Sequence, residues 1–158
     1  MPLPFMPVPI VLQNIGIFLA GIILGRKMGA LSVIVFLLLA ATGLPVLSGG
    51  RGGIGVFVGP SAGFLFLYPF IAYFIGLIRD RYYGKINFLI LFVTTLIIGV
   101  LALDIIGTII MGFIIHISIS KAFLLSFTFM PGDIIKAIIS SLIGATILNH
   151  TRFKSLIQ

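Results

Sequence analysis

The sequence lacks cysteine and tryptophan altogether, and only 8% of its 158 residues are charged. Without cysteine, the chain can form no disulfide framework, Cys-ligated zinc site or iron–sulfur cluster. Without tryptophan, any aromatic belt at a membrane interface has to come from tyrosine. Hydrophobic residues make up 60% of the chain, which is more than a soluble domain normally carries. These proportions predict an all-α integral membrane protein that forms a single domain over residues 1–158.

Motifs typical of enzymes are also missing from the sequence. It contains no glycine-rich nucleotide loop ending in Lys-Ser/Thr, no His/Glu metal helix and no nucleophile–base pair. The two histidines, His116 and His150, fall on opposite sides of the predicted membrane and form no metal site. We therefore expect neither an enzyme nor a metal or cofactor. If the protein transports a solute and this needs energy, the energy must come from ion coupling or from another subunit. The net charge of +7 comes from residues at helix ends, which indicates membrane orientation rather than nucleic-acid binding.

Apolar segments divide the chain into a predicted bundle of about five transmembrane helices. The segments are 10–25, 30–44, 64–78, 87–117 and 131–148. The fourth is long enough to require tilt or a bend, which we expect at Gly107 or Gly112. Residues 118–130 are amphipathic and predict either a short surface helix or a re-entrant segment. We expect the last helix to begin at Pro131 and a polar, basic tail to follow it.

A glycine- and proline-rich loop, Pro45–Gly63, separates the second and third segments. Glycine permits positive φ and a close approach of the backbone to a ligand, whereas proline fixes φ. The loop is therefore either a tight connector or a binding lid. Arg51 at its centre favours the lid.

Basic residues are distributed unevenly over the two predicted sides of the membrane. One side carries Arg26, Lys27, Arg79, Arg81, Lys85, Arg152 and Lys154, and the other carries Arg51 and Lys121. The positive-inside rule places the first group and the C-terminus in the cytoplasm and the glycine-rich loop outside the cell. With five spans the N-terminus would also lie outside, unless a further helix precedes it.

A few polar residues fall within the apolar segments, where they are costly and face a bundle interior or cavity. Asp133 and Lys136 are three residues apart and share a helix face. They predict either a polar substrate site that opens outward or a structural ion pair. For Asp104 we expect Lys136 or a backbone amide as the partner. Gln13 and Asn14 are expected to form hydrogen bonds between helices or to contact a ligand.

Several motifs resemble the BioY family in order and spacing over residues 7–148. They are Pro7-Val-Pro-Ile-Val-Leu-Gln-Asn, Leu19-Ala-Gly-Ile-Ile-Leu-Gly, Gly43-Leu-Pro-Val, Gly59-Pro-Ser-Ala-Gly-Phe-Leu and Pro131-Gly-Asp-Ile-Ile-Lys. BioY proteins are the biotin-binding S components of energy-coupling-factor (ECF) vitamin transporters. The resemblance implies biotin uptake in the plasma membrane together with a coupling transmembrane subunit and ATP-binding subunits. It also implies a six-helix pattern, of which this chain lacks the first helix.

The sequence departs from the family pattern at a few positions. Ser61, Ala62 and Phe64 replace Thr, Gly and Tyr in the motif after Gly59, and Val11 replaces Thr in the first motif. These departures leave the ligand preference open. The alternatives are an S component for another small vitamin, or a membrane scaffold without a transport role.

The resemblance also implies roles for individual residues in binding biotin. Asp133 would accept hydrogen bonds from the ureido N–H groups, Lys136 would donate to the ureido carbonyl, and Arg51 would bind the valerate carboxylate. The opposite orientation, with Lys136 on the carboxylate, is the alternative. Further contacts are expected from Gln13, Asn14 and Tyr68, and apolar walls from Phe57, Phe64 and Phe66.

Overall fold

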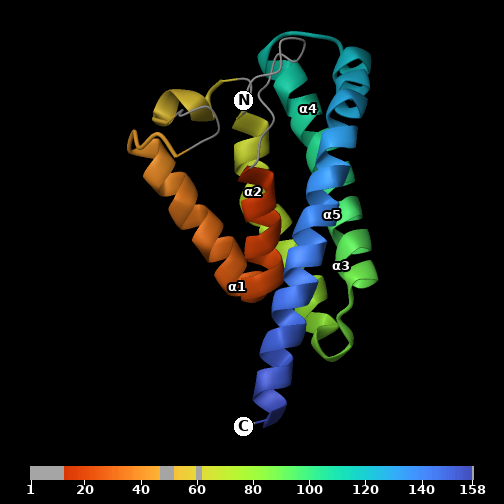
Figure 1. Ribbon diagram of the computed structural model, residues 1–158. Helices are drawn as coiled ribbons and strands as arrows, with labels where there is room; N and C mark the ends of the chain where they lie inside the picture. The colour runs from red at the N-terminus through yellow and green to blue at the C-terminus, as the bar shows by residue number, and fades with distance from the viewer. Residues whose placement is uncertain (1–12, 47–51, 60–61, 158) are drawn as a thin grey trace.

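The computed structural model describes the backbone of residues 13–46, 52–59 and 62–157, with side chains from residue 14 to residue 150. Four helices in this part of the chain are long and apolar enough to cross a membrane. They span Asn14–Ala41, Ala62–Arg81, Phe88–Ile114 and Ile119–His150. Many large apolar side chains on their outer faces are exposed, as expected for helices that face lipid. The predicted all-α membrane bundle is confirmed (Figure 1).

Helix α1 (Gln13–Ala41) reverses direction at Gly25, where the backbone takes φ 82° and ψ −178°. Its two arms form a V in Figure 1. A Cβ added to Gly29 would lie 2.7 Å from the carbonyl oxygen of Ala20, a contact that nine residues of straight helix could not make. α1 therefore supplies both the first and the second expected segments, and the described part of the bundle consists of five helical rods.

Polar groups from helix α2 (Ala62–Arg81) hold this reversal in place. Arg79 donates from Nε and Nη2 to the carbonyl oxygens of Ile22 and Ile23, at 3.0 and 3.1 Å. The first amide after Gly25 donates to Asp80 Oδ2 at 3.2 Å. Arg79 also pairs with Asp80 at 2.8 Å. Two adjacent residues of α2 thus provide hydrogen-bond partners for the backbone carbonyls at the end of one arm and for the backbone amide at the start of the next.

The next rod runs from α3 (Phe88–Thr94) through the π-helical segment η3 (Thr95–Ala102) to α4 (Leu103–Ile114). The expected bend at Gly107 or Gly112 is wrong, because both glycines lie within α4 and the irregular turn precedes it. A Cβ at Gly107 would lie 2.5 Å from the Phe64 ring, and one at Gly112 would lie 2.7 Å from the Ala122 Cβ. These glycines therefore allow close packing between helices.

Helix α5 (Ile119–Ile157) is continuous over 39 residues, so the predicted helix start at Pro131 is wrong. Residues 118–130 form neither a separate surface helix nor a re-entrant segment, and the helix continues through the expected basic tail. The start lies at Ser118, whose hydroxyl oxygen accepts from the Lys121 amide at 3.3 Å. Pro131 lies inside the helix, which membrane helices tolerate.

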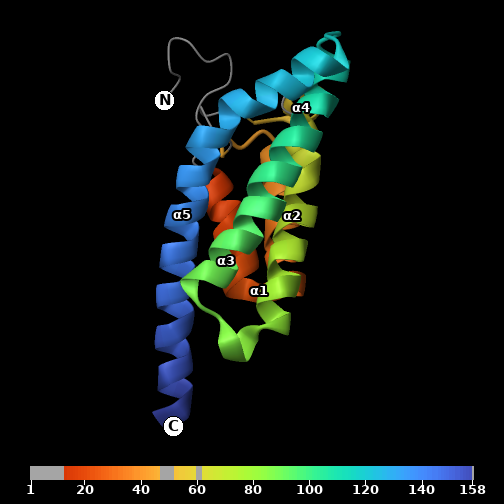
Figure 2. The ribbon, with the colours of Figure 1, turned by 90° about the vertical axis from the view of Figure 1, so that its right-hand side faces the viewer.

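The two ends of the bundle differ in charge. The turn between α2 and α3, the reversal of α1 and the end of α5 lie at one end in both Figure 1 and Figure 2. The short helix η1 (Ile54–Phe57) and the start of α5 lie at the other, which we call the loop end. Arg26, Arg79 and Lys85, which the sequence predicts to share one side of the membrane, lie away from the loop end.

Candidate substrate-binding site

An ion pair lies on the inner face of α5. Lys136 Nζ lies 2.6 Å from Asp133 Oδ1, and both residues are buried. One turn of helix brings them together, because side chains three residues apart occupy the same face. A buried pair gains its stability only where further hydrogen bonds satisfy the remaining polar atoms.

Helices α1 and α2 supply the neutral partners of this pair. Asn14 Nδ2 donates to Asp133 Oδ1 at 3.5 Å, and Tyr68 Oη donates to Asn14 Oδ1 at 3.0 Å. All these side chains are buried. A chain of polar groups therefore runs from α2 through α1 to α5, and we call Asn14, Tyr68, Asp133 and Lys136 the polar cluster.

A further carboxyl group, that of Asp104 on α4, lies beside the polar cluster. Asp104 is 1% exposed, and the charges of Asp133 and Lys136 both act on it. No N–H or O–H donor among the described residues pairs with either carboxylate oxygen, and the carboxyl group interacts directly with that of Asp133. The expected backbone amide partner is therefore not found in the described part of the chain. The sequence predicts Lys136 as a possible partner of Asp104, but it does not identify Asp104 as a substrate-binding residue, because Asp104 lies on another helix, 29 positions before Asp133.

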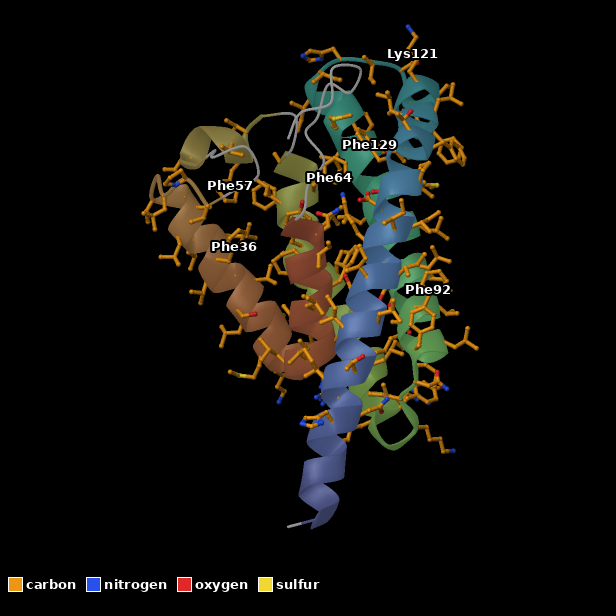
Figure 3. The ribbon with its side chains drawn as sticks, in the orientation of Figure 1. Phe36, Phe57, Phe64, Phe92, Lys121 and Phe129 are labelled. Atoms are coloured by element: carbon orange, nitrogen blue, oxygen red, sulfur yellow. The ribbon has the colours of Figure 1, made fainter. Side chains whose placement is uncertain are left out.

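An aromatic pair, Phe64 and Phe129, separates the polar cluster from the loop end. The two rings meet edge to face with centroids 6.4 Å apart, between the start of α2 and the upper part of α5 (Figure 3). Phe64 precedes Tyr68 by four residues and Phe129 precedes Asp133 by four. The aromatic pair thus lies about 6 Å, or one turn, nearer the loop end.

The aromatic walls expected from the sequence are found only in part. Phe64 packs toward the interior, where Gly107 leaves room for its ring. Phe66 is exposed and packs edge-on against Phe57, with centroids 5.9 Å apart. Phe129 is the partner that sequence reasoning missed, because it falls in the stretch expected to lie outside the last helix.

Two of the predicted binding residues cannot be placed in this site. Arg51 lies outside the described residues. Gln13 is the first residue of α1, but its side chain also lies outside the described part. The structure brings together the other four, Asn14, Tyr68, Asp133 and Lys136. Their arrangement offers an ammonium and an amide as donors and a carboxylate as acceptor, within a low-dielectric bundle where each hydrogen bond is strengthened.

Comparison with known proteins gives one consistent result. The family model described as BioY family matches residues 1–153. The chain is 47% identical over 145 residues to the probable biotin transporter BioY of Bacillus subtilis (strain 168), covering 92% of this chain and 77% of the relative. It is 39% identical over 151 residues to the biotin transporter BioY of Rhizobium etli, covering 92% and 81%.

A solved structure matches the fold as well. It is a crystal structure of the S-component for biotin from an ECF-type ABC transporter, with a TM-score of 0.86 and 40% sequence identity. The match covers 93% of this chain and 79% of that one.

Proposed function

This chain belongs to the BioY family, and from that premise we propose that it captures biotin as the substrate-specific S component of an energy-coupling-factor transporter. It acts in the plasma membrane with a transmembrane coupling subunit and ATP-binding subunits, and it is not an enzyme. The observation that carries the proposal is the polar cluster, which holds an ion pair and an amide inside an apolar bundle. Charged groups at this depth are typical of substrate pathways.

Biotin carries the groups that such a cluster would bind. Its ureido ring has two N–H donors and one carbonyl acceptor, its second ring is a thioether, and its valerate chain ends in a carboxylate. We infer that Asp133 accepts from the ureido ring and that Lys136 donates to the carbonyl. The thioether would lie against Phe64 and Phe129, because sulfur packs favourably at aromatic rings.

The remaining expected contacts complete this orientation. Arg51, on the glycine-rich loop, would pair with the valerate carboxylate, for which its planar guanidinium is suited. The opposite orientation would place that carboxylate on Lys136, directly beside Asp133. Repulsion between two carboxylates in a buried site disfavours it. Gln13 would contribute a neutral contact from the first turn of α1.

We further propose that the C-terminus and the basic end of the bundle lie in the cytoplasm, with the loop end outside. The positive-inside rule supports this orientation, because Arg26, Arg79 and Lys85 all lie away from the loop end. Biotin would then enter past Phe64 and Phe129 from the extracellular side.

Substitution of the ion pair tests the proposed site. Asp133→Asn or Lys136→Met should each weaken biotin binding by at least about tenfold, or about 1.4 kcal/mol, because each leaves a buried polar group unpaired. Equilibrium binding of radiolabelled biotin to purified protein measures this. Thr146→Val is a matched control, since Thr146 is exposed on the same helix and bonds only to the Leu142 carbonyl. Undiminished binding by both ion-pair variants would contradict the assignment.

A ligand panel distinguishes biotin from another small vitamin. Biotin should raise the midpoint of thermal unfolding, because a ligand stabilises the state it binds. A larger shift with a different vitamin would identify that vitamin as the substrate. A scaffold without a transport role would respond to no ligand and co-purify with no coupling subunit.

A further inference from the structure

The polar cluster and its neighbour Asp104 bring together two carboxyl groups and one ammonium group. Asp104 on α4 is 1% exposed, and its carboxyl group forms a side-chain hydrogen bond with that of Asp133 on α5. Two ionised carboxylates are both acceptors, so a hydrogen bond between them requires a proton on one of the two. The two acids therefore share one proton, as is common for carboxyl groups that lie side by side in a buried site.

The charges around the two acids balance only when that proton is present. Lys136 on α5 contributes one positive charge. Tyr68 on α2 is a phenol, which is neutral near pH 7, Asn14 on α1 is an uncharged amide, and η3 contains no titratable residue. One ammonium group with two carboxylates would leave a net negative charge in a buried site, which is strongly destabilising. With one acid protonated, the net charge is zero.

The other hydrogen bonds of the cluster indicate which acid holds the proton. Lys136 Nζ donates to Asp133 Oδ1 at 2.6 Å, and Asn14 Nδ2 donates to the same oxygen at 3.5 Å. Donors of this kind favour the ionised form of a carboxyl group. No N–H or O–H donor among the described residues pairs with either carboxyl oxygen of Asp104, and the Thr108 hydroxyl donates to the Asp104 backbone carbonyl instead. Asp133 is therefore the carboxylate and Asp104 the acid.

The π-helical segment η3 helps to direct Asp104 inward. Buried residues on this rod recur as adjacent pairs, at Thr94/Thr95, Gly99/Val100, Leu103/Asp104, Gly107/Thr108 and Met111/Gly112. The pairs are four residues apart except across η3, where the interval is five. The wider π turn absorbs the extra residue and keeps Asp104 on the buried face.

We propose that Asp104 is a positioning residue for biotin binding, which stays protonated and donates its proton to the Asp133 carboxylate. An ionised carboxylate has about four acceptor sites. Lys136, Asn14 and Asp104 occupy three of them and fix the carboxylate in one orientation, which leaves the last site for the ligand. This inference rests on the proposed function, in which a ureido N–H takes that site. Lys136 stays available to the ureido carbonyl, because it has only one carboxylate to neutralise.

Infrared spectroscopy tests the proton directly, because the chain has few acids. Asp80, Asp104 and Asp133 are its only acidic side chains. The purified full chain, at neutral pH in a detergent without ester or acid groups, should show the carbonyl stretching band of a protonated carboxylic acid. The Asp104→Asn variant should lack this band. A wild-type spectrum without the band, or a band that persists in the variant, would overturn the proposal.

Biotin affinity measures the consequence for the ligand. Asp104→Asn keeps a donor for Asp133 in its amide group, so its affinity should stay within about threefold of the wild type. Asp104→Leu has no donor and should bind biotin at least about fivefold more weakly, because a hydrogen bond to a charged group is lost. Equilibrium binding of radiolabelled biotin to purified protein gives the affinities. If Asp104→Leu does not fold, Asp104→Ala makes the same comparison.

A matched control and the remaining outcomes separate positioning from a general disturbance of the fold. Thr95→Val removes a buried hydroxyl from the same rod that bonds only to the Leu91 carbonyl, and it should leave biotin binding within about twofold. Equal losses in Asp104→Asn and in the variant without a donor, or undiminished binding in both, would overturn the proposal. A wild type that shows the infrared band but binds no biotin would instead contradict the proposed function, so the two failures are distinguishable.

Discussion

At the scale of single residues, Tyr68 sets the orientation of the Asn14 amide. Its hydroxyl donates to Asn14 Oδ1, which leaves Asn14 Nδ2 directed at Asp133. Without this bond the amide is free to turn, and its carbonyl oxygen would then face a carboxylate. Tyr68 therefore acts on ligand binding through Asn14 as a positioning residue, in addition to any contact of its own.

Tyr68→Phe should reduce biotin affinity by about three- to tenfold, the net value of one buried hydrogen bond of about 0.5–1.5 kcal/mol. Equilibrium binding to purified protein gives the affinities. Tyr73→Phe is the matched control, because Tyr73 lies on the same helix, is 37% exposed and packs against Phe74. The interpretation fails if Tyr68→Phe binds biotin as tightly as the control does.

How far the sequence predicts the site depends on how local each contact is. Asp133 and Lys136 are one turn apart, so helix geometry alone placed them together. Asn14 reaches Asp133 across 119 positions and Tyr68 reaches Asn14 across 54, distances over which periodicity carries no information. Asn14 was predicted as a polar residue within an apolar segment, without its partner, and the inclusion of Tyr68 depended on the family resemblance. Asp104 was predicted to be buried with Lys136 or a backbone amide as its partner, but no family motif marked it as a binding residue.

At the scale of elements, the reversal of α1 depends on a backbone conformation that glycine adopts easily. Gly25 has φ 82°, and a Cβ there would lie 2.8 Å from Asp80 Oδ1. The same carboxylate receives the first amide after the turn and pairs with Arg79. A side chain at this position would strain the backbone and displace the carboxylate that holds it.

Gly25→Ala should lower the midpoint of thermal unfolding in detergent by at least about 3 °C, because left-handed backbone costs an L-residue roughly 1–2 kcal/mol. The control is Gly16→Ala on the same helix, where an added Cβ meets nothing within 4 Å. Equal midpoints for the two variants would show that the reversal tolerates a side chain.

The bounds of a helix could be predicted where glycine and charged residues interrupt an apolar run. They were predicted less well where such residues are absent or lie within a helix. Gly84 and the charged residues around it marked the turn between α2 and α3 correctly. The sequence Pro131-Gly-Asp is compatible both with the start of a helix and with the interior of a membrane helix, which tolerates proline. The start of α5 was therefore predicted at the wrong residue. The π turn of η3 has no sequence signature comparable to the capping residues that mark the ends of α-helices. The bend was therefore predicted at Gly107 or Gly112, which follow η3.

At the scale of the whole molecule, orientation can be measured directly because the chain has no cysteine of its own. Ile54→Cys places a thiol in the loop, where Ile54 is 73% exposed, and Lys85→Cys places one at the opposite end. A membrane-impermeant maleimide added to intact cells should label the first variant and spare the second, as the positive-inside rule requires. Both should react after the membrane is permeabilised. The reverse pattern would invert the proposed topology.

The central claim is that the polar cluster holds biotin. The most direct measurement is saturation binding of radiolabelled biotin to the purified wild-type chain, with Asp133→Asn measured in parallel. The account predicts one saturable site per chain, displaced by excess unlabelled biotin and weakened in the variant. The absence of saturable binding, or a site that Asp133→Asn leaves unchanged, would contradict it.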